Sequence, residues 1–428
     1  MTQILLGIID SAMVGSIDSV LLAGSALVNN ILSIPYVMGI GLTYAISPLV
    51  ATANGNRQHS RCLHIAYNGF LLCTVFAILI GLGIHWGSDI VFHLDQAPEV
   101  AAVSQDYLII MGWSTIPMLL FLALKQFTDG LEYTRTAMIL ALSSIPLNTF
   151  LNYIFIFGKW GMPRYELFGA GIGTLVTRII IFIGLLIVVF RSPKYAPFRR
   201  HLSVSLQIKK KTMRQLLHIG IPSSLQYAME SGAFAVSGII IGWFGAVQLA
   251  AHQIAMSSAA LTFMVSMGLS AAGSILVGNS LGKRDLATAR LIGRKTLLIG
   301  LAYGLACALL FMVTSQKIPY FFNNEPAVIE YASMLLILAG IFQISDATQA
   351  IAVGLLRGLY DVRVPMVFII VAYWVIGIPL GYYLAFHTSL EARGMWIGLV
   401  TGLTIVAISL TFRFFSVSKQ ESVFARLT

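Results

Sequence analysis

The sequence predicts an all-α integral membrane protein with twelve transmembrane helices, arranged as two six-helix lobes that repeat in parallel. Three observations lead to this fold class. Hydrophobic residues make up 57% of the 428 residues and charged residues only 10%, whereas soluble domains carry about 25% charged residues. Apolar runs that reach the roughly 20 residues needed to cross a bilayer recur along the whole chain. The second half of the chain also repeats the pattern of the first.

Charged residues and Gly, Pro and Asn breaks separate the expected spans. We place them at 1–15, 20–52, 63–84, 101–127, 136–157 and 168–190 in the first half, and at 214–242, 247–279, 290–315, 328–356, 364–386 and 394–416 in the second. The first run lacks a basic flank and a small-residue cleavage site, so we expect no signal peptide. The expected domains are a first lobe at 1–191, a basic cytoplasmic linker at 192–213, a second lobe at 214–417 and a tail at 418–428.

Two segments show that the halves are copies. Shifted by 227 residues, "VMGIGLTYAISPLVATANGNR" lies over "MVSMGLSAAGSILVGNSLGKR", so that Arg57 meets Arg284. At a shift of 228, "DGLEYTRTAM" lies over "RGLYDVRVPM", so that Gly130 meets Gly358. Six spans per copy give both copies the same direction across the membrane, and such parallel repeats suit alternating access. The shift also places the start of the seventh span before Met1, so we expect the first helix to be clipped at its cytoplasmic end.

Basic residues set the expected orientation. If the linker lies inside, the inner segments hold most of the 27 Lys and Arg residues, and the outer ones hold only Lys159, Arg164, Lys317 and Arg393. The positive-inside rule then puts both termini in the cytoplasm of a multi-pass protein of the inner (plasma) membrane. Because the charge of +10 is spread over every inner loop, it indicates contact with membrane lipids and excludes a nucleic-acid footprint.

Apart from acids in loops or close to span ends, three acids lie inside predicted spans: Asp10, Glu230 and Asp346. A charge at the centre of a membrane helix costs about 2.5–3.5 kcal/mol on insertion scales, so such residues usually mark ion or proton paths. Under the shift of 227, Asp10 is equivalent to a position seven residues after Glu230, close to two turns further along the same helix face. Each lobe is therefore expected to hold an inward acid of its own.

Few groups could neutralise these acids. Once the Lys and Arg residues of the inner and outer segments are set aside, only Lys125 and Arg178 remain inside spans. Lys125 can snorkel to an interface, and Arg178 could pair with Asp10. The second half offers no such base to Glu230 and Asp346. The alternative is a purely structural role, in which these acids are protonated or hydrogen-bonded inside the protein.

The sequence gives little support for a nucleotide-binding or metal-binding site. The segment "GNSLGKRD" is too short for a phosphate loop, "GAGIGT" is typical of close helix packing, and the eight His residues have no metal-ligand spacing. We therefore expect no enzyme activity and no cofactor.

Four segments together resemble the multidrug and toxic compound extrusion (MATE) transporters, and within them the NorM-like branch: "GIIDSAMVG", "NTFLNYIFIFGKWGMP", "AAHQIAMSSAALTFMVSMGLSAAGSILVGNSLGKRD" and "FQISDATQAIAVGLLRGLYD". The resemblance implies a monomeric antiporter that expels cationic, often aromatic compounds in exchange for Na⁺ or H⁺. It implies a first-lobe proton or cation site at Asp10, Asn148 and Asn152, and a second-lobe cation site at Glu230 and Asp346, with Na⁺ as the candidate metal.

Polar and aromatic residues near the acids are the candidates for a substrate cavity: Gln226, Tyr227, Gln253 and Gln349. The two acids of the second lobe offer hard oxygen ligands that serve Na⁺ and protons alike. The alternative function is a lipid-linked oligosaccharide flippase of related architecture. A flippase would need a basic cavity for phosphates, whereas the residues in the middle of these spans are acidic, with Arg178 as the exception.

Overall fold

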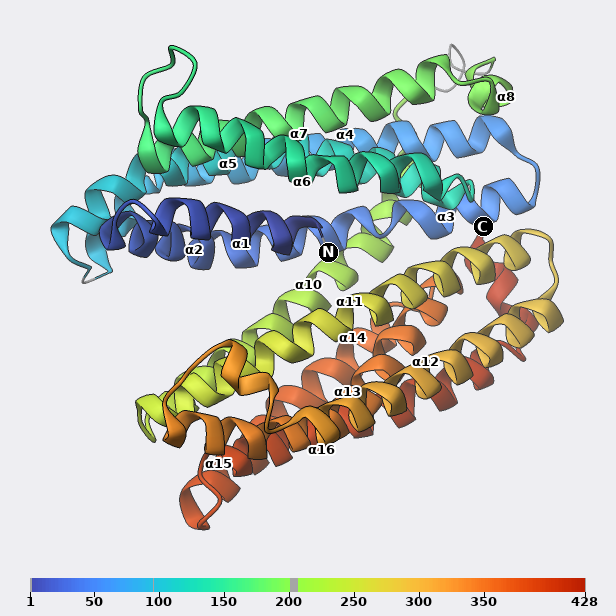
Figure 1. The fold of residues 1–428 in the computed structure, drawn as a ribbon. Helices are drawn as coiled ribbons and strands as arrows, with labels where there is room; N and C mark the ends of the chain where they lie inside the picture. The colour runs from blue at the N-terminus through green and yellow to red at the C-terminus, as the bar shows by residue number, and fades with distance from the viewer. Residues whose placement is uncertain (1, 95, 201–206, 428) are drawn as a thin grey trace. The chain divides into compact units, whose positions relative to one another are not determined.

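The computed structural model describes residues 2–94, 96–200 and 207–427, and helices dominate these ranges (Figure 1). The first half contains α1 (Thr2–Gly15), α2 (Ser19–Thr43), α3 (Ile46–Gly55), α4 (His59–Trp86), α5 (Pro98–Gly130), α6 (Thr134–Phe157), α7 (Glu166–Arg191), a short 3₁₀ turn η2 (Pro193–Tyr195) and α8 (Ala196–Arg199). The second half contains α10 (Lys210–Gly242), α11 (Ala246–Gly282), α12 (Leu286–Thr314), α13 (Pro326–Gly358), α14 (Arg363–Ile370), η4 (Val371–Gly377), α15 (Ile378–His387) and α16 (Ala392–Val417).

Ten helical segments in the described ranges are long and apolar enough to cross a membrane. Their bounds lie within a few residues of the predicted spans; the span predicted at 63–84, for example, is α4. The remaining predicted spans are α1, which has 14 residues, and α10, whose first turn is basic. Taken with the matching folds described below, this confirms the predicted all-α membrane fold of twelve helices in two six-helix sets.

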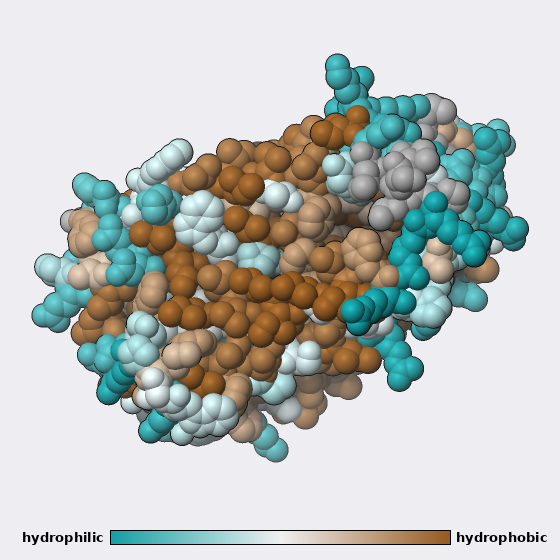
Figure 2. Space-filling model, turned by 90° about the horizontal axis from the view of Figure 1, so that it is seen from above, coloured by the Kyte–Doolittle hydropathy of each residue, from teal (hydrophilic) through white to brown (hydrophobic). Residues whose placement is uncertain are grey.

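The surface carries the composition that lipid requires. Figure 2 shows hydrophobic residues gathered along the middle of the visible face, with hydrophilic residues toward both ends. Exposed apolar side chains such as Leu79, Leu309 and Val313, each more than 60% accessible, would be a liability in water, where large apolar patches drive association. In a bilayer the same side chains are solvated by acyl chains.

The chain divides into two compact units, 1–224 and 225–428, and the boundary lies inside α10. In the first unit α5 is the central helix and packs against α2, α3, α4 and α7. In the second unit α13 is central and packs against α11, α12 and α16. Since α13 is the repeat of α5, the two units use the same packing plan.

The repeat extends to single atoms at the ends of the central helices. A Cβ added to Gly130 at the end of α5 would lie 2.8 Å from the Ser47 carbonyl oxygen, and one added to Gly358 at the end of α13 would lie 2.6 Å from that of Ser274. Ser47 and Ser274 are themselves 227 residues apart. Both units therefore need a glycine at this helix crossing, because any side chain would push the two backbones apart.

Candidate functional site

The second unit brings Glu230 and Asp346 to one cavity. Glu230 lies on α10 and Asp346 on α13, and both are buried. The two residues line a cavity of about 210 Å³ together with Tyr227, Phe234 and Phe342. The structure thus places two carboxyl groups beside aromatic rings, an arrangement that suits organic cations because the face of an aromatic ring attracts positive charge.

Hydrogen bonding around these two acids is sparse. The Gln349 side-chain amide donates to Glu230 Oε1 over 2.9 Å. No described residue donates a hydrogen bond to the Asp346 side chain, and neither acid takes part in a salt bridge within the described ranges. Buried carboxylates normally have several partners, so this pair retains oxygen atoms available to bind something else.

Tyr373 completes the site and was not predicted from the sequence. It lies in η4, a stretch of π-helix between α14 and α15, and its buried ring packs edge-on against Phe234, 5.7 Å away between centroids. Its hydroxyl lies beside Glu230 and Gln349, yet it makes no hydrogen bond of ordinary geometry in the described structure. Short π-helical insertions of this kind frequently occur at functional sites.

The neighbouring Trp374 fixes this segment to α10. Its indole nitrogen donates to the carbonyl oxygen of Met229 over 3.0 Å, one residue before Glu230. On the other side of η4, a Cβ added to Gly398 of α16 would lie only 2.4 Å from the Gly377 carbonyl oxygen. Close contact with α16 and an indole bond to α10 therefore set the position of the Tyr373 hydroxyl.

The free oxygen atoms of this site fit a hard cation. Gln349 Oε1 and the Tyr373 hydroxyl are both buried without a hydrogen-bond partner in the part of the chain that the structure describes. With the carboxylates of Glu230 and Asp346 they form a set of oxygen donors, the kind of ligand that hard cations prefer. The same carboxylates can equally be neutralised by protons.

The first unit has a different arrangement around Asp10 of α1. Asp10 Oδ1 accepts from the Asn152 amide over 2.5 Å, and Oδ2 accepts from the Thr174 hydroxyl over 3.0 Å. The Asn148 amide donates to Thr174 Oγ1 over 3.2 Å, and the Asn152 amide lies 3.3 Å from Asn148 Oδ1. The structure thus gathers the three predicted residues into one buried network on α1, α6 and α7, and adds Thr174, which the sequence did not single out.

Arg178 lies near this network without a direct ion pair to Asp10. Its guanidinium donates to Ser114 Oγ over 2.5 Å and to the Tyr36 hydroxyl over 3.3 Å, and it lies over the Tyr36 ring. The sequence left a pairing of Arg178 with Asp10 open. In the structure Asn152 and Thr174 bind the Asp10 carboxylate, and residues of α2 and α5 bind the guanidinium.

The predicted cavity residues divide into two groups. Tyr227 lines the cavity and Gln349 binds Glu230. Gln226 is buried but does not line this cavity, and Gln253 is exposed on α11. Gln253 follows His252, which instead points inward and accepts a hydrogen bond from the Trp396 indole over 3.2 Å.

Two repeated bundles of membrane-length helices, each with an acidic polar site buried among its helices, define a multi-pass membrane protein. The sequence model of the MatE family matches residues 1–154 and 222–383. The chain belongs to this family.

Three comparisons describe its place there. The chain is 34% identical over 424 residues to a probable multidrug resistance protein NorM of Rhodopseudomonas palustris, covering 98% of this chain and 89% of that one. The fold is similar to the crystal structure of a eukaryotic MATE transporter, AtDTX14, with a TM-score of 0.88 and 21% identity, covering 100% of this chain and 95% of that one. It is also similar, with a TM-score of 0.87 and 18% identity, to a MOP superfamily transporter from Pyrococcus furiosus, covering 99% and 93% of the two chains. In that protein the reverse polarity of the binding pocket suggests a different function.

Proposed function

We propose that this chain is a secondary active multidrug efflux antiporter, which exports organic cations in exchange for Na⁺ or H⁺ by alternating access. The observation that carries the proposal is the cavity lined by both Glu230 and Asp346 and by aromatic rings. The probable multidrug resistance protein of R. palustris supports it as a relative. Because one similar fold is described with reversed pocket polarity, the acidic character of this cavity is a stronger argument than the fold.

Coupling follows from electrostatics. Two carboxylates in a buried cavity cannot both stay charged and empty, because desolvation and mutual repulsion each oppose the charged form. Some positive species must therefore neutralise the pair at every stage: a metal cation, protons or the organic cation itself. If the site faces alternate sides of the membrane, entry of the ion on one side displaces the drug there, and the gradient drives export.

Each residue has a specific task in this scheme. Glu230 and Asp346 bind the coupling ion, Gln349 and Tyr373 complete the oxygen donors around it, and Phe234 and Phe342 contact the drug. The Asp10 network of the first unit is a second cation or proton site. Its carboxylate already accepts two hydrogen bonds, so it needs a positive partner less than the open pair does.

The proposed setting is the inner membrane, with both termini in the cytoplasm. The basic residues of the predicted inner segments support this orientation through the positive-inside rule. Small organic cations and membrane lipids are the proposed partners, the protein acts as a monomer, and no cofactor takes part.

A lipid-linked oligosaccharide flippase remains the competing function. Its substrate carries a pyrophosphate, which the two acids of the second-unit cavity would repel. Arg178 and Arg357 are buried arginines that could favour it. Arg178 is held by Ser114 and Tyr36, however, and the Arg357 guanidinium donates to the Tyr227 hydroxyl over 3.4 Å.

Ethidium efflux from proteoliposomes tests the proposal. The purified protein is given a Na⁺ gradient alone, a pH gradient alone, or neither, and dye release is followed by fluorescence. We expect release that depends on at least one gradient and is unaffected by a pyrophosphate-linked lipid. Dye movement that ignores both gradients, or that the lipid blocks while the lipid itself crosses the bilayer, would contradict the antiporter assignment.

A further inference from the structure

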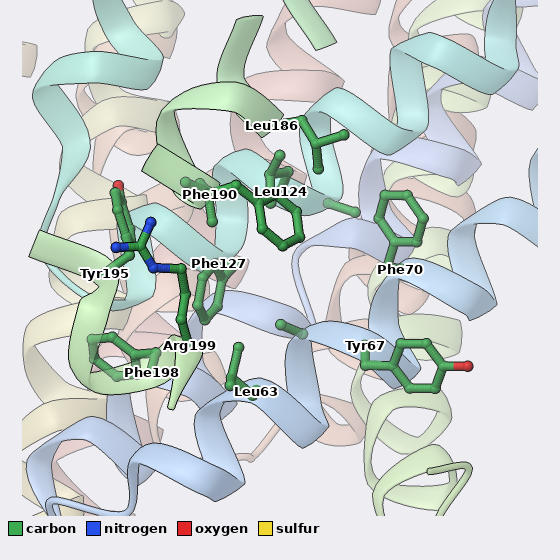
Figure 3. Close-up of a pocket in the computed structure, with 13 residues that line it drawn as sticks. Leu63, Tyr67, Phe70, Leu124, Phe127, Leu186, Phe190, Tyr195, Phe198 and Arg199 are labelled. Atoms are coloured by element: carbon green, nitrogen blue, oxygen red, sulfur yellow. The ribbon is translucent and has the colours of Figure 1, made fainter. Parts of the chain in front are cut away.

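A second cavity, of about 190 Å³, lies at one end of the first unit and is far more apolar than the first (Figure 3). Its walls are the first turns of α4, the last turns of α5 and α7, and the short segment η2–α8. Apolar cavities of about 150 Å³ stay dry and can hold a benzene-sized molecule. This one is large enough to hold part of an apolar chain.

The segment after α7 forms one wall because it is amphipathic. Tyr195 and Phe198 are buried, and the rings of both lie within 6.5 Å of the Phe127 ring between centroids. Lys194 and Arg200 on the same segment are exposed. The segment thus places aromatic rings against the helices and positive charges outside, as expected for a chain lying at a membrane interface.

Two polar groups of the wall are suited to a ligand. Arg199 is the one charged residue among the described residues that line the cavity. The Tyr195 hydroxyl is buried without a hydrogen-bond partner in the described structure, and burial raises the pKa of Tyr195 to about 12, so it remains a donor. The nearby Asp129 carboxylate is paired with Lys125 over 2.5 Å and does not neutralise Arg199.

These features exclude the transported drugs as the occupant. An organic cation would meet the positive charge of Arg199 and no acidic partner. A water-soluble anion would contact mainly the carbon atoms of Phe, Leu and Tyr side chains. An anionic phospholipid satisfies both parts, since its phosphate matches Arg199 and its acyl chain matches the apolar wall.

We propose that this cavity binds one acyl chain of an anionic phospholipid, whose phosphate is held by Arg199 and the Tyr195 hydroxyl. The exposed Lys194 and Arg200 attract the headgroup more weakly, as any basic residue does near an anionic surface. The bound lipid fastens η2–α8 to α4, α5 and α7 of the first unit.

Lipid binding by the detergent-purified protein tests this proposal without any transport. Equal amounts of dioleoylphosphatidylglycerol or dioleoylphosphatidylcholine are added, free lipid is removed by gel filtration, and retained lipid is measured by mass spectrometry and by the shift in melting temperature. We expect retention and stabilisation with phosphatidylglycerol, much less with phosphatidylcholine, and none with glycerol phosphate, which lacks acyl chains.

Three variants locate the binding. Arg199→Gln should weaken phosphatidylglycerol retention by more than the roughly fivefold that one basic residue near an anionic surface contributes. Arg200→Gln, its matched control outside the cavity, should weaken retention by no more than that. Ala66→Phe, which fills the cavity from α4, should abolish retention and keep the lipid-free melting temperature. Equal losses in Arg199→Gln and Arg200→Gln would show general surface attraction, and full retention by Ala66→Phe would show that the chain binds elsewhere; either result overturns the proposal.

Discussion

Gln349 donates its side-chain amide to the Glu230 carboxylate over 2.9 Å and so joins α13 to α10 beside the cavity that Asp346 also lines. One turn separates Asp346 from Gln349 along α13, so the same helix face provides an acid to the cavity and an amide to the second acid. This bond orients Glu230 while leaving Gln349 Oε1 without a partner among the described residues.

Replacing this amide should weaken ion binding more than folding. Gln349→Leu leaves a buried Glu230 without its donor, which costs about 1–3 kcal/mol, and it also removes an oxygen from the proposed ion site. We expect the ion concentration for half-maximal ethidium efflux to rise several-fold. Gln343→Leu is the matched control: Gln343 is a buried amide on the same helix, but it donates to the Ala259 carbonyl oxygen over 3.2 Å. Both variants should melt at similarly lower temperatures, and only Gln349→Leu should change the ion dependence; equal ion dependence in the two would remove Gln349 from the site.

The first-unit network should tolerate loss of its charge. Asp10→Asn keeps a side chain of the same shape beside Asn152 and Thr174, so the protein should fold and melt as the parent does. Export of at least some cations should fall, because a neutral amide cannot bind a cation as the carboxylate does. A purified Asp10→Asn protein that exports every tested cation at the parental rate would leave this network with a structural role only.

Replacing the neutral residues of the same network should reduce transport less than replacing Asp10 does. Asn148→Ala and Asn152→Ala remove groups that orient the carboxylate but leave its charge in place, so transport should fall by less than in Asp10→Asn. Dose-response curves for several cations on the three proteins provide the ranking. Either alanine variant being more damaging than Asp10→Asn would mean that hydrogen bonding, and not charge, is what this site supplies.

The two repeat-related glycines provide a test of the fold. Gly130→Ala and Gly358→Ala each force a Cβ to within 2.8 Å or 2.6 Å of a serine carbonyl oxygen on a neighbouring helix, and overpacking of this kind typically costs about 1–3 kcal/mol. Gly83→Ala and Gly268→Ala are the controls, since, among the described residues, no atom beyond the local helix backbone lies within 4 Å of a Cβ added at either helical position. The first pair should melt at lower temperature than the second, and similar melting points in all four would contradict the packing described for α5 and α13.

Much of the fold could be predicted from the sequence because membrane helices satisfy their own backbone hydrogen bonds. Length and composition then locate each span, and the internal repeat gives the equivalence of α5 and α13 before any contact is known. The acids at positions 10, 230 and 346 were found for the same reason: a carboxylate inside an apolar run is unusual enough to be noticed.

Thr174 and Tyr373 could not be found in that way. Threonine and tyrosine are ordinary inside membrane helices, and only the tertiary structure brings the first to Asp10 and the second to Glu230. The π-helical turn of η4 has no sequence signature that would have indicated where Tyr373 points. Gln253 lies on an exposed face of α11, so its place in a substrate cavity stays a prediction.

The most direct test of the central claim, that Glu230 and Asp346 together bind the coupling ion, combines melting and gradient-driven efflux on the same proteins. Glu230→Gln, Asp346→Asn and the double variant are compared with the parent. Each single variant should lose gradient-driven ethidium efflux yet remain at least as stable as the parent, because removing one charge from an unpaired buried site relieves a cost of several kcal/mol. The double variant should transport no worse than either single one, since the two residues act as one site. Melting temperatures that fall sharply, as the loss of about 3–5 kcal/mol on breaking a buried ion pair would produce, or a single variant that still couples efflux to an ion gradient, would contradict the assignment.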